Sequence, residues 1–211
     1  MKKKLSIFLL TLFLTSEIYA QFGIKAGVNM ANEIASVGKS NFSDGLKNSL
    51  TGFQFGVVYQ LMPKKSGFGG EIEAILTQKG SSIDSTNHVY TIAQGYKEMT
   101  YFEVPLNLRY RKMIGFIGIY GFAGLYGGYE LSSITVDEIT NIVDNGTYTS
   151  FIDHLDYGYN VGLGIELFKK VQLGATFSQG IKNIVTSNSV LPLSISTTNR
   201  VFSVNLIYIL K

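Results

Sequence analysis

The sequence predicts an all-β protein, an eight-stranded antiparallel up-and-down transmembrane β-barrel that follows a cleaved signal peptide. Eight segments alternate apolar and polar residues with the two-residue period of a β-strand. Short and long connections alternate between these segments, as in a barrel whose long loops all lie at one end. The composition, with 13 tyrosines, 14 phenylalanines and 23 glycines but only 3 prolines, also favours strands over helices.

The first 20 residues have the three parts of a secretory signal peptide. Lys2, Lys3 and Lys4 precede the apolar stretch LSIFLLTLFL, and the small residue Ala20 stands just before Gln21. The apolar stretch is shorter than the roughly 20 residues that a membrane-spanning helix needs. We therefore expect residues 1–20 to be a signal peptide cleaved after Ala20, and residues 21–211 to form a single barrel domain.

The charge and the cysteine content exclude several classes of protein. The signal peptide holds three lysines and one glutamate, so the formal charge falls from +3 in the precursor to +1 in the mature chain. The remaining lysines and arginines are scattered along the sequence, which argues against a nucleic-acid partner. The chain has no cysteine, and this excludes a lipid-anchored precursor, disulfides and cysteine-based metal or redox sites.

The first four expected strands alternate clearly. They cover residues 22–30, 51–61, 68–79 and 101–110. In the first, the apolar positions alternate with Lys25 and Asn29, and in the third they alternate with Glu71, Glu73 and Lys79. In the fourth, Glu103 and Arg109 fall on the polar face, and Pro105 predicts a local irregularity because proline lacks the N–H donor.

The last four expected strands cover residues 116–131, 157–167, 171–177 and 202–210. The first of these, GFIGIYGFAGLYGGY, is apolar on both faces, so a membrane helix is its structural alternative. Five glycines at every third position would each cost about 0.8–1 kcal/mol in a helix interior, which favours a strand. The segment at 157–167 alternates cleanly and places Glu166 on its polar face.

The connections between the segments support a transmembrane barrel. The short ones are residues 62–67, 111–115 and 168–170, and the long ones lie near residues 32–50, 80–100, 132–155 and 183–199. An outer-membrane barrel with both termini in the periplasm has eight strands of about 9–11 residues, three tight turns and four longer outer loops. The sequence matches this order.

The polar faces indicate which side of each strand points inward. A soluble, lipocalin-like barrel needs an exterior rich in charged residues, whereas here the polar faces hold mainly Gly, Asn, Gln and Ser. We therefore expect the apolar faces to point toward lipid and the polar faces into a narrow lumen. Charges of both signs would neutralise one another there and fill the interior. This expected lumen charge network consists of Lys25, Glu71, Glu73, Lys79, Glu103, Arg109 and Glu166.

Tyrosines near the segment ends are candidates for interfacial girdles, because the ring prefers the apolar side and the hydroxyl the wet side. The candidates are Tyr59, Tyr101, Tyr110, Tyr157 and Tyr208.

Four stretches of the mature chain are FGIKAGVN, GGEIEAILTQKGS, YFEVPLNLRY and QGIKNI. Together they resemble the outer-membrane β-barrel family of the Bacteroidetes, which includes the PorT-like proteins. In the third stretch, Tyr101, Glu103 and Pro105 look like the pattern of an aromatic residue, a glutamate and a proline in that family. The resemblance implies an outer-membrane location and an eight-stranded barrel, and its PorT-like members imply a role in assembling a secretion apparatus.

Little in the sequence points to catalysis or to a cofactor. His88 and His154 both fall in expected outer loops, and a metal site needs more ligands at close spacing. Asp153, His154 and Asp156 form the densest polar group, which leaves a lipid-modifying enzyme acting at the outer rim as an alternative. Glu71 and Glu73 are about 7 Å apart by strand rise and could act as a glycosidase pair, but mutual neutralisation with lumen cations is favoured.

We therefore expect a non-enzymatic outer-membrane barrel with a plugged lumen. It would act as a structural, binding or secretion-accessory protein through its outer loops, since loops on a rigid scaffold carry variable contacts. The expected partners are outer-membrane lipid and an envelope or secretion-complex protein, with no nucleic acid and no cofactor. A rim-active enzyme and a soluble periplasmic carrier of an apolar ligand remain as alternatives.

Overall fold

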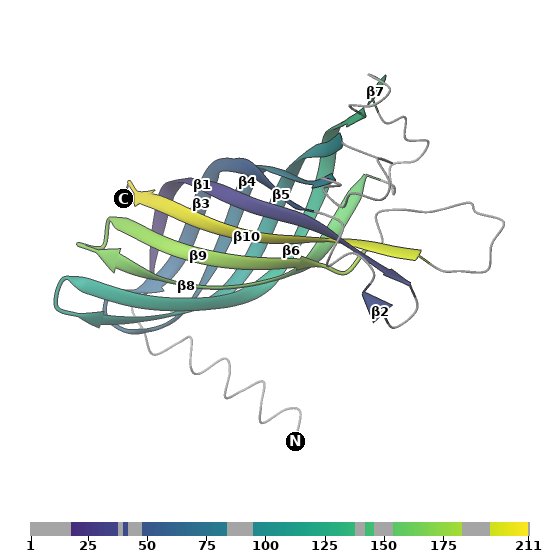
Figure 1. Cartoon of the computed structure of the whole chain (residues 1–211). Helices are drawn as coiled ribbons and strands as arrows, with labels where there is room; N and C mark the ends of the chain where they lie inside the picture. The colour runs from purple at the N-terminus through teal and green to yellow at the C-terminus, as the bar shows by residue number, and fades with distance from the viewer. Residues whose placement is uncertain are drawn as a thin grey trace.

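Eight long strands form the wall of a closed barrel in the computed structural model (Figure 1). The structure describes residues 18–37, 40–41, 48–83, 95–137, 142–145, 154–182 and 195–210. The wall strands are β1 (Ile18–Val37), β3 (Asn48–Pro63), β4 (Gly67–Ile83), β5 (Gly95–Ile114), β6 (Ile117–Asp137), β8 (Leu155–Leu167), β9 (Val171–Gly180) and β10 (Ile195–Ile209). Two short strands, β2 (Ser40–Asn41) and β7 (Ile142–Asn145), extend the edges of β1 and β6.

The wall is antiparallel throughout, and each wall strand pairs with the wall strands before and after it in the sequence. The sheet closes because β1 pairs with β10 in a continuous register from Gly23↔Ile209 to Val37↔Ile195. This confirms the predicted closed, eight-stranded up-and-down barrel. Closure leaves no long unpaired edge among the wall strands.

Three tight turns lie at one end of the barrel, where β10 also ends (Figure 1). They connect β3 to β4, β5 to β6, and β8 to β9, as the sequence predicts. In the last of them, Phe168 and Lys169 both have positive φ angles, and the Lys170 N–H donates to the Leu167 carbonyl at 3.0 Å. These features correspond to a type I′ turn, whose twist suits a two-residue hairpin connection.

The strands are longer than the sequence predicts. β5 and β6 have 20 and 21 residues, whereas the segments we expected there, 101–110 and 116–131, have 10 and 16. Residues that we assigned to the outer loops, such as 32–37, 80–83, 95–100 and 132–137, continue the wall strands. Their mainly polar composition misled the prediction, because it resembles that of a loop and lacks the regular apolar alternation of the central strand segments.

The apolar faces point outward, as predicted. Phe53, Leu106 and Leu163 are each more than 60% exposed, while the alternating polar residues are buried inside. This arrangement is the opposite of a lipocalin-like carrier, in which the apolar side chains line the interior. The inward apolar residues Val58, Ile207 and Ile209 form only a small cluster.

One tyrosine that we expected in an interfacial girdle lies elsewhere. Tyr101 is 1% exposed and donates to the Glu130 carboxylate inside the barrel. On β5, Tyr101 points to the same side of the strand as the inward residues Glu103 and Arg109. This alternation, and not its position near a segment end, determines its orientation. The other four candidates, Tyr59, Tyr110, Tyr157 and Tyr208, are exposed on the outer surface.

The glycine-rich fifth segment is a strand, β6, and glycines of nearby wall strands leave space for its inward tyrosine. Tyr120 points inward from β6, and its ring lies against Gly164 of β8 and Gly174 of β9. A Cβ atom at Gly164 would overlap the Tyr120 side chain. The missing side chains therefore make room for the inward aromatic residues of the same wall.

Pro105 lies within β5, as expected, and interrupts the ladder locally. The β4–β5 register passes from Ile72↔Leu106 to Ile75↔Glu103 without the two intervening pairs and without a shift. Proline has no N–H to donate at this point. True register shifts occur at Ser49/Gln54 and at Thr100/Tyr101, where the wall bulges.

The expected signal peptide lies mainly outside the described residues. Residues 1–17 are not described, and Ile18–Ala20 extend the start of β1 by pairing with Leu61–Pro63. Cleavage after Ala20 remains a prediction, and the mature β1 would then begin at Gln21. No helix among the described residues is long and apolar enough to cross a membrane.

Candidate functional site

The polar interior of the barrel gathers the charged residues that the sequence singled out. All seven residues of the expected lumen charge network have inward positions on β1, β4, β5 and β8 and are at most 6% exposed. Each of them also forms an ion pair with a charged side chain from another strand. The alternation of the strands brings these residues together, although they are up to 141 positions apart in the sequence.

Two arginines form the layer nearest the tight turns. Arg109 pairs with Glu71 at 2.5 Å, and Arg111 pairs with Glu166 at 2.8 Å. Arg111 also donates to the carbonyl of Pro63, at the end of β3. The guanidinium of Arg109 lies 3.6 Å from the centroid of the Tyr120 ring, which adds a cation–π contact.

Two glutamines connect these ion pairs across the barrel. Gln60 of β3 and Gln172 of β9 donate to each other at 3.0 Å, and Gln60 also donates to Glu71 at 2.6 Å. Gln172 accepts from Arg109 at 2.8 Å and donates to Glu166 at 2.8 Å. Buried charges are tolerated when such additional hydrogen bonds satisfy them.

The middle layer contains one ion pair and a chain of amides. Lys25 pairs with Glu73 at 2.5 Å. Asn107 donates to both Glu71 and Glu73, at 3.1 and 3.4 Å, and accepts from Asn160 at 2.8 Å. The two neighbouring glutamates of β4 are thus each matched with a cation and linked through one asparagine.

The third layer is built around Lys79, which contacts two carboxylates. It pairs with Glu103 and with Asp156, the latter at 2.9 Å. Asp156 also accepts from Asn199 at 3.0 Å and from Tyr126 at 3.4 Å. This layer therefore joins β4, β5, β6, β8 and β10.

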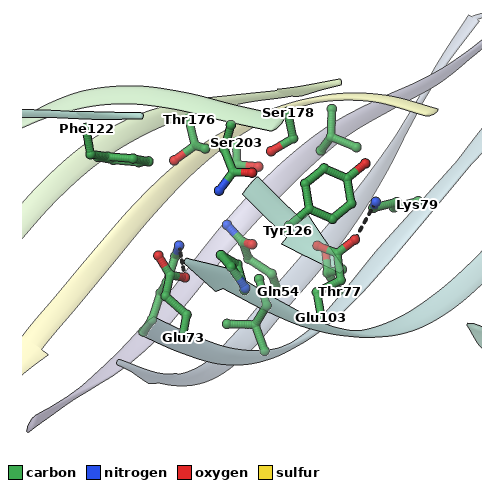
Figure 2. Close-up of a pocket in the computed structure, with 15 residues that line it drawn as sticks. Gln54, Glu73, Thr77, Lys79, Glu103, Phe122, Tyr126, Thr176, Ser178 and Ser203 are labelled. Atoms are coloured by element: carbon green, nitrogen blue, oxygen red, sulfur yellow. Dashed lines mark hydrogen bonds and ion pairs between the residues drawn. The ribbon is translucent and has the colours of Figure 1, made fainter. Parts of the chain in front are cut away.

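A small cavity separates the middle layer from the Lys79 layer (Figure 2). In Figure 2, Lys79, Glu103 and Tyr126 lie together on one side, and Thr176, Ser178 and Ser203 lie on the other. The cavity leaves about 20 Å³ for solvent, which suits about one water molecule. Asn160 lines it with a side-chain oxygen that accepts no hydrogen bond from the described residues.

Sequence reasoning missed three charged residues of the interior. Arg111 was assigned to a tight turn, Asp156 to an outer loop, and Glu130 to a segment that reads as apolar on both faces. The structure places all three inside, each at most 2% exposed. The alternation of each strand could have identified them, because each lies an even number of positions from other inward residues of its strand. Arg111, for example, is two positions from Arg109.

The arrangement offers little for general acid–base chemistry. Glu71 and Glu73 are each paired with a cation, so they do not form the separated acid and base of a glycosidase. His154 stacks on Tyr129, with ring centroids 5.2 Å apart, while Asp156 is directed toward Lys79. His88 and Asp153 lie outside the described residues. Within the described part of the chain, no group of three His, Cys, Asp or Glu residues is arranged to hold a metal ion.

The sequence matches one protein family over most of its length. Residues 13–186 match the family described as "outer membrane protein beta-barrel domain". No curated protein sequence matches this chain.

Several solved structures, including those of Ail, OprG and Neisserial surface protein A, are similar to this chain at low sequence identity. Ail, the attachment invasion locus protein of Yersinia pestis, is 12% identical, with 90% of this chain and 98% of Ail covered and a TM-score of 0.43. OprG from Pseudomonas aeruginosa is 12% identical, with 92% and 97% covered and a TM-score of 0.45. Neisserial surface protein A is 12% identical, with 90% and 98% covered and a TM-score of 0.44.

Proposed function

The chain belongs to the outer membrane protein beta-barrel domain family, and from this premise we propose that it is a non-enzymatic outer-membrane protein whose barrel is a plugged scaffold for its outer loops. In this proposal the loops bind a ligand outside the cell or another envelope protein, including a component of a secretion apparatus. Both chain termini then lie in the periplasm, on the side of the tight turns.

The observation that carries the proposal is the filling of the lumen. Ion pairs and amides at three levels join strands that are not neighbours in the wall, and the cavity between two of these levels accommodates about one water molecule. An eight-stranded barrel has an interior just wide enough for side chains to fill. These features favour a scaffold over a diffusion pore.

The absence of an enzyme site is part of the proposal. In the described residues, the interior carboxylates are engaged by cations or hydrogen bonds, and a general base must have a substrate proton within hydrogen-bond reach. Replacing His154 with alanine tests the rim-active alternative. We expect unchanged lipid composition of the envelope, and altered acyl chains would contradict the proposal.

The plugged lumen can be tested by solute flux. We expect vesicles that contain the purified barrel to show no swelling in small sugars and no steady ion conductance. A porin reconstituted at the same protein-to-lipid ratio serves as the positive control. Sugar flux through the wild-type barrel would contradict the scaffold function.

The loop function can be tested in intact cells by photocrosslinking. A photoreactive residue in the connection at residues 84–94 should give specific adducts with a partner, since this connection is one of the expected outer loops. The matched control carries the same residue at Ser66, in the tight turn between β3 and β4. The same two positions also report the orientation of the barrel in the membrane. If an impermeant reagent added to intact cells labels a cysteine placed in the 84–94 connection but not one placed at residue 66, the long connections face outward.

A further inference from the structure

The three tight turns bring together lysines that are far apart in the sequence. Lys64 and Lys65 lie between β3 and β4, Lys112 lies near the end of β5, and Lys169 and Lys170 lie between β8 and β9. All five are exposed. No aspartate or glutamate occurs in the turn segments 62–68, 112–117 and 167–171. We call these five residues the lysine rim.

The lysine rim is continuous around part of the barrel end, because the turns contact one another. The Met113 N–H donates to the Ser66 hydroxyl at 3.0 Å, which joins the first two turns. The Phe168 N–H donates to the Phe116 carbonyl at 2.9 Å, which joins the second and third. Scattered positions in the sequence therefore become one positive surface, which sequence reasoning missed.

Apolar side chains lie within the same surface. Phe116 and Phe168 stack with ring centroids 5.1 Å apart, yet they are 59% and 68% exposed. Ile114 is also exposed. Exposed aromatic and aliphatic side chains mixed with lysines are typical of groups that lie at the level of lipid headgroups.

The depth of the lysines fits this level. Lys64 follows the outward-facing Leu61 by three residues, and Lys112 follows Tyr110 by two. Strand rise limits these separations to about 10 Å along the wall. The headgroup region on each side of a bilayer is roughly 5–8 Å thick, so extended lysine side chains reach the lipid phosphates.

We propose that the lysine rim binds the phosphate groups of anionic phospholipids in the leaflet that surrounds the turn end of the barrel. Family membership places the barrel in a membrane, so lipid is present at this depth wherever the wall is exposed. The turns are too short to carry the lysines far from the wall toward a distant protein. Lipid phosphate is therefore favoured over an acidic macromolecule as the occupant.

The proposal can be tested by the lipid that remains around the purified barrel. The wild-type barrel would be reconstituted in vesicles of phosphatidylcholine and phosphatidylglycerol, extracted with a copolymer that keeps surrounding lipid, and analysed by mass spectrometry. We expect phosphatidylglycerol to be enriched around the wild type relative to the bulk vesicle. The rim variant K65Q/K112Q/K169Q, with one change in each turn, should reduce this enrichment about fivefold or more at low salt.

A matched variant removes the same number of positive charges from the other end. K97Q/K182Q/R200Q alters residues near the outer ends of β5, β9 and β10 and should keep the wild-type enrichment. Salt at about 1 M should abolish the enrichment of the wild type, because the Debye length falls to roughly 3 Å. Circular dichroism and gel mobility of all variants would establish that the barrel still folds.

Two outcomes would overturn the proposal. One is equal enrichment in the wild type and the rim variant, and the other is an equal loss in the rim variant and the matched variant. A third result would identify a different occupant. In it, phosphatidylglycerol is not enriched around the wild type in mixed vesicles, and the wild type in pure phosphatidylcholine vesicles binds soluble polyglutamate whereas the rim variant does not. The surface would then recognise an acidic macromolecule. The plugged-scaffold function does not depend on any of these results.

Discussion

At the scale of single residues, the lumen buries ionisable side chains almost completely, and each of them therefore depends on its partner. Glu71 is 2% exposed, and it accepts hydrogen bonds from Arg109, Gln60 and Asn107. Removing the cation from such a group leaves a buried charge that the amides alone do not compensate. Stability should therefore respond more strongly to the loss of one partner than to the loss of both.

The first prediction concerns Arg109. Arg109→Ala should lower the free energy of unfolding by about 3–5 kcal/mol, because it leaves Glu71 without its cation. Urea titration of the barrel reconstituted in vesicles measures this change. The double variant E71Q/R109M should recover most of the loss, since it removes both charges and keeps an amide for Asn107.

Arg200 provides a control for this prediction. It is exposed and donates to Gln179 at 3.1 Å, so Arg200→Ala should cost less than about 1 kcal/mol. If the double variant is as unstable as Arg109→Ala, the shape of the side chains and not their charge determines the stability of the lumen.

The second prediction concerns the space that a glycine leaves. Gly164→Ala should destabilise the barrel by about 1–3 kcal/mol, because the new methyl group overlaps the Tyr120 side chain and the Leu173 carbonyl and forces both to move. The shift would also disturb the contact between Tyr120 and the Arg109 guanidinium. Gly127→Ala is the matched control, since nothing lies within 4 Å of its added Cβ atom. Equal urea midpoints for the two variants would refute the packing argument.

At the scale of elements, the hairpin turn between β8 and β9 uses residues that suit its geometry poorly. Phe168 and Lys169 have φ angles of +54° and +57°, in the left-handed region that side chains with a Cβ atom disfavour. A type I′ turn prefers Asn-Gly at these positions. The ladder of β8 with β9, together with the stacking of Phe168 on Phe116, holds the turn in place.

The third prediction follows from this turn. Lys169→Gly should raise the free energy of unfolding by about 0.5–1 kcal/mol, because relief of the left-handed conformation exceeds the entropy that glycine loses on folding. Lys170→Gly, at a position without a positive φ angle, should give no gain. Both variants remove one rim lysine, so a difference between their urea midpoints reports the backbone and not the charge.

The elements differ in how well the sequence predicts them. Where one face meets lipid and the other the lumen, as at 22–30 or 157–167, alternation predicts both the strand and its inward face. At the outer ends of β5 and β6, polar and apolar residues are mixed on both faces, as with Met99 inside and Tyr96 outside, so these ends could not be read from alternation. Glu130 and Asp156 have the inward parity of β6 and β8, but Glu130 lies in a segment that is apolar on both faces and Asp156 lies just before the expected start of its strand.

The lysine rim shows a different limit of sequence reasoning. Its residues come from three turns that are about 50 residues apart in the chain, and only the strand order makes them neighbours. The lysines therefore look scattered along the sequence, although the folded barrel brings them together at one end. The lumen ion pairs were accessible in part, because alternation alone assigns Lys25, Glu71 and Arg109 to one side.

At the scale of the whole molecule, the fold depends on the contact between its first and last strands. β1 and β10 pair over 15 residues, and this pairing closes the wall and completes the lumen. Asn205 of β10 and Gln54 of β3 bond across β1, so the interior network also spans the closure. Opening this seam would expose both a row of backbone groups and the charged interior to the membrane.

The last prediction tests the closure directly. Ala26 of β1 lies opposite Leu206 of β10, and paired residues in antiparallel strands have Cα atoms about 4.5–5.5 Å apart, within the range of a disulfide. Because the chain has no cysteine, A26C/L206C should form one intramolecular disulfide under mild oxidation. The bond would close most of the chain into a loop and raise the free energy of unfolding by about 4 kcal/mol if its geometry is unstrained. Gel mobility after boiling, with and without reductant, detects it.

The control for the closure is A26C/L163C, since Leu163 lies on β8, which does not pair with β1. This pair should remain reduced in the folded barrel, because its side chains point outward from strands that are separated around the wall. A disulfide that forms equally in both variants would show that oxidation trapped unfolded chains. If the A26C/L206C pair stays reduced in a folded sample, β1 and β10 are not paired. The barrel would then be open between these two strands, which contradicts the closed wall.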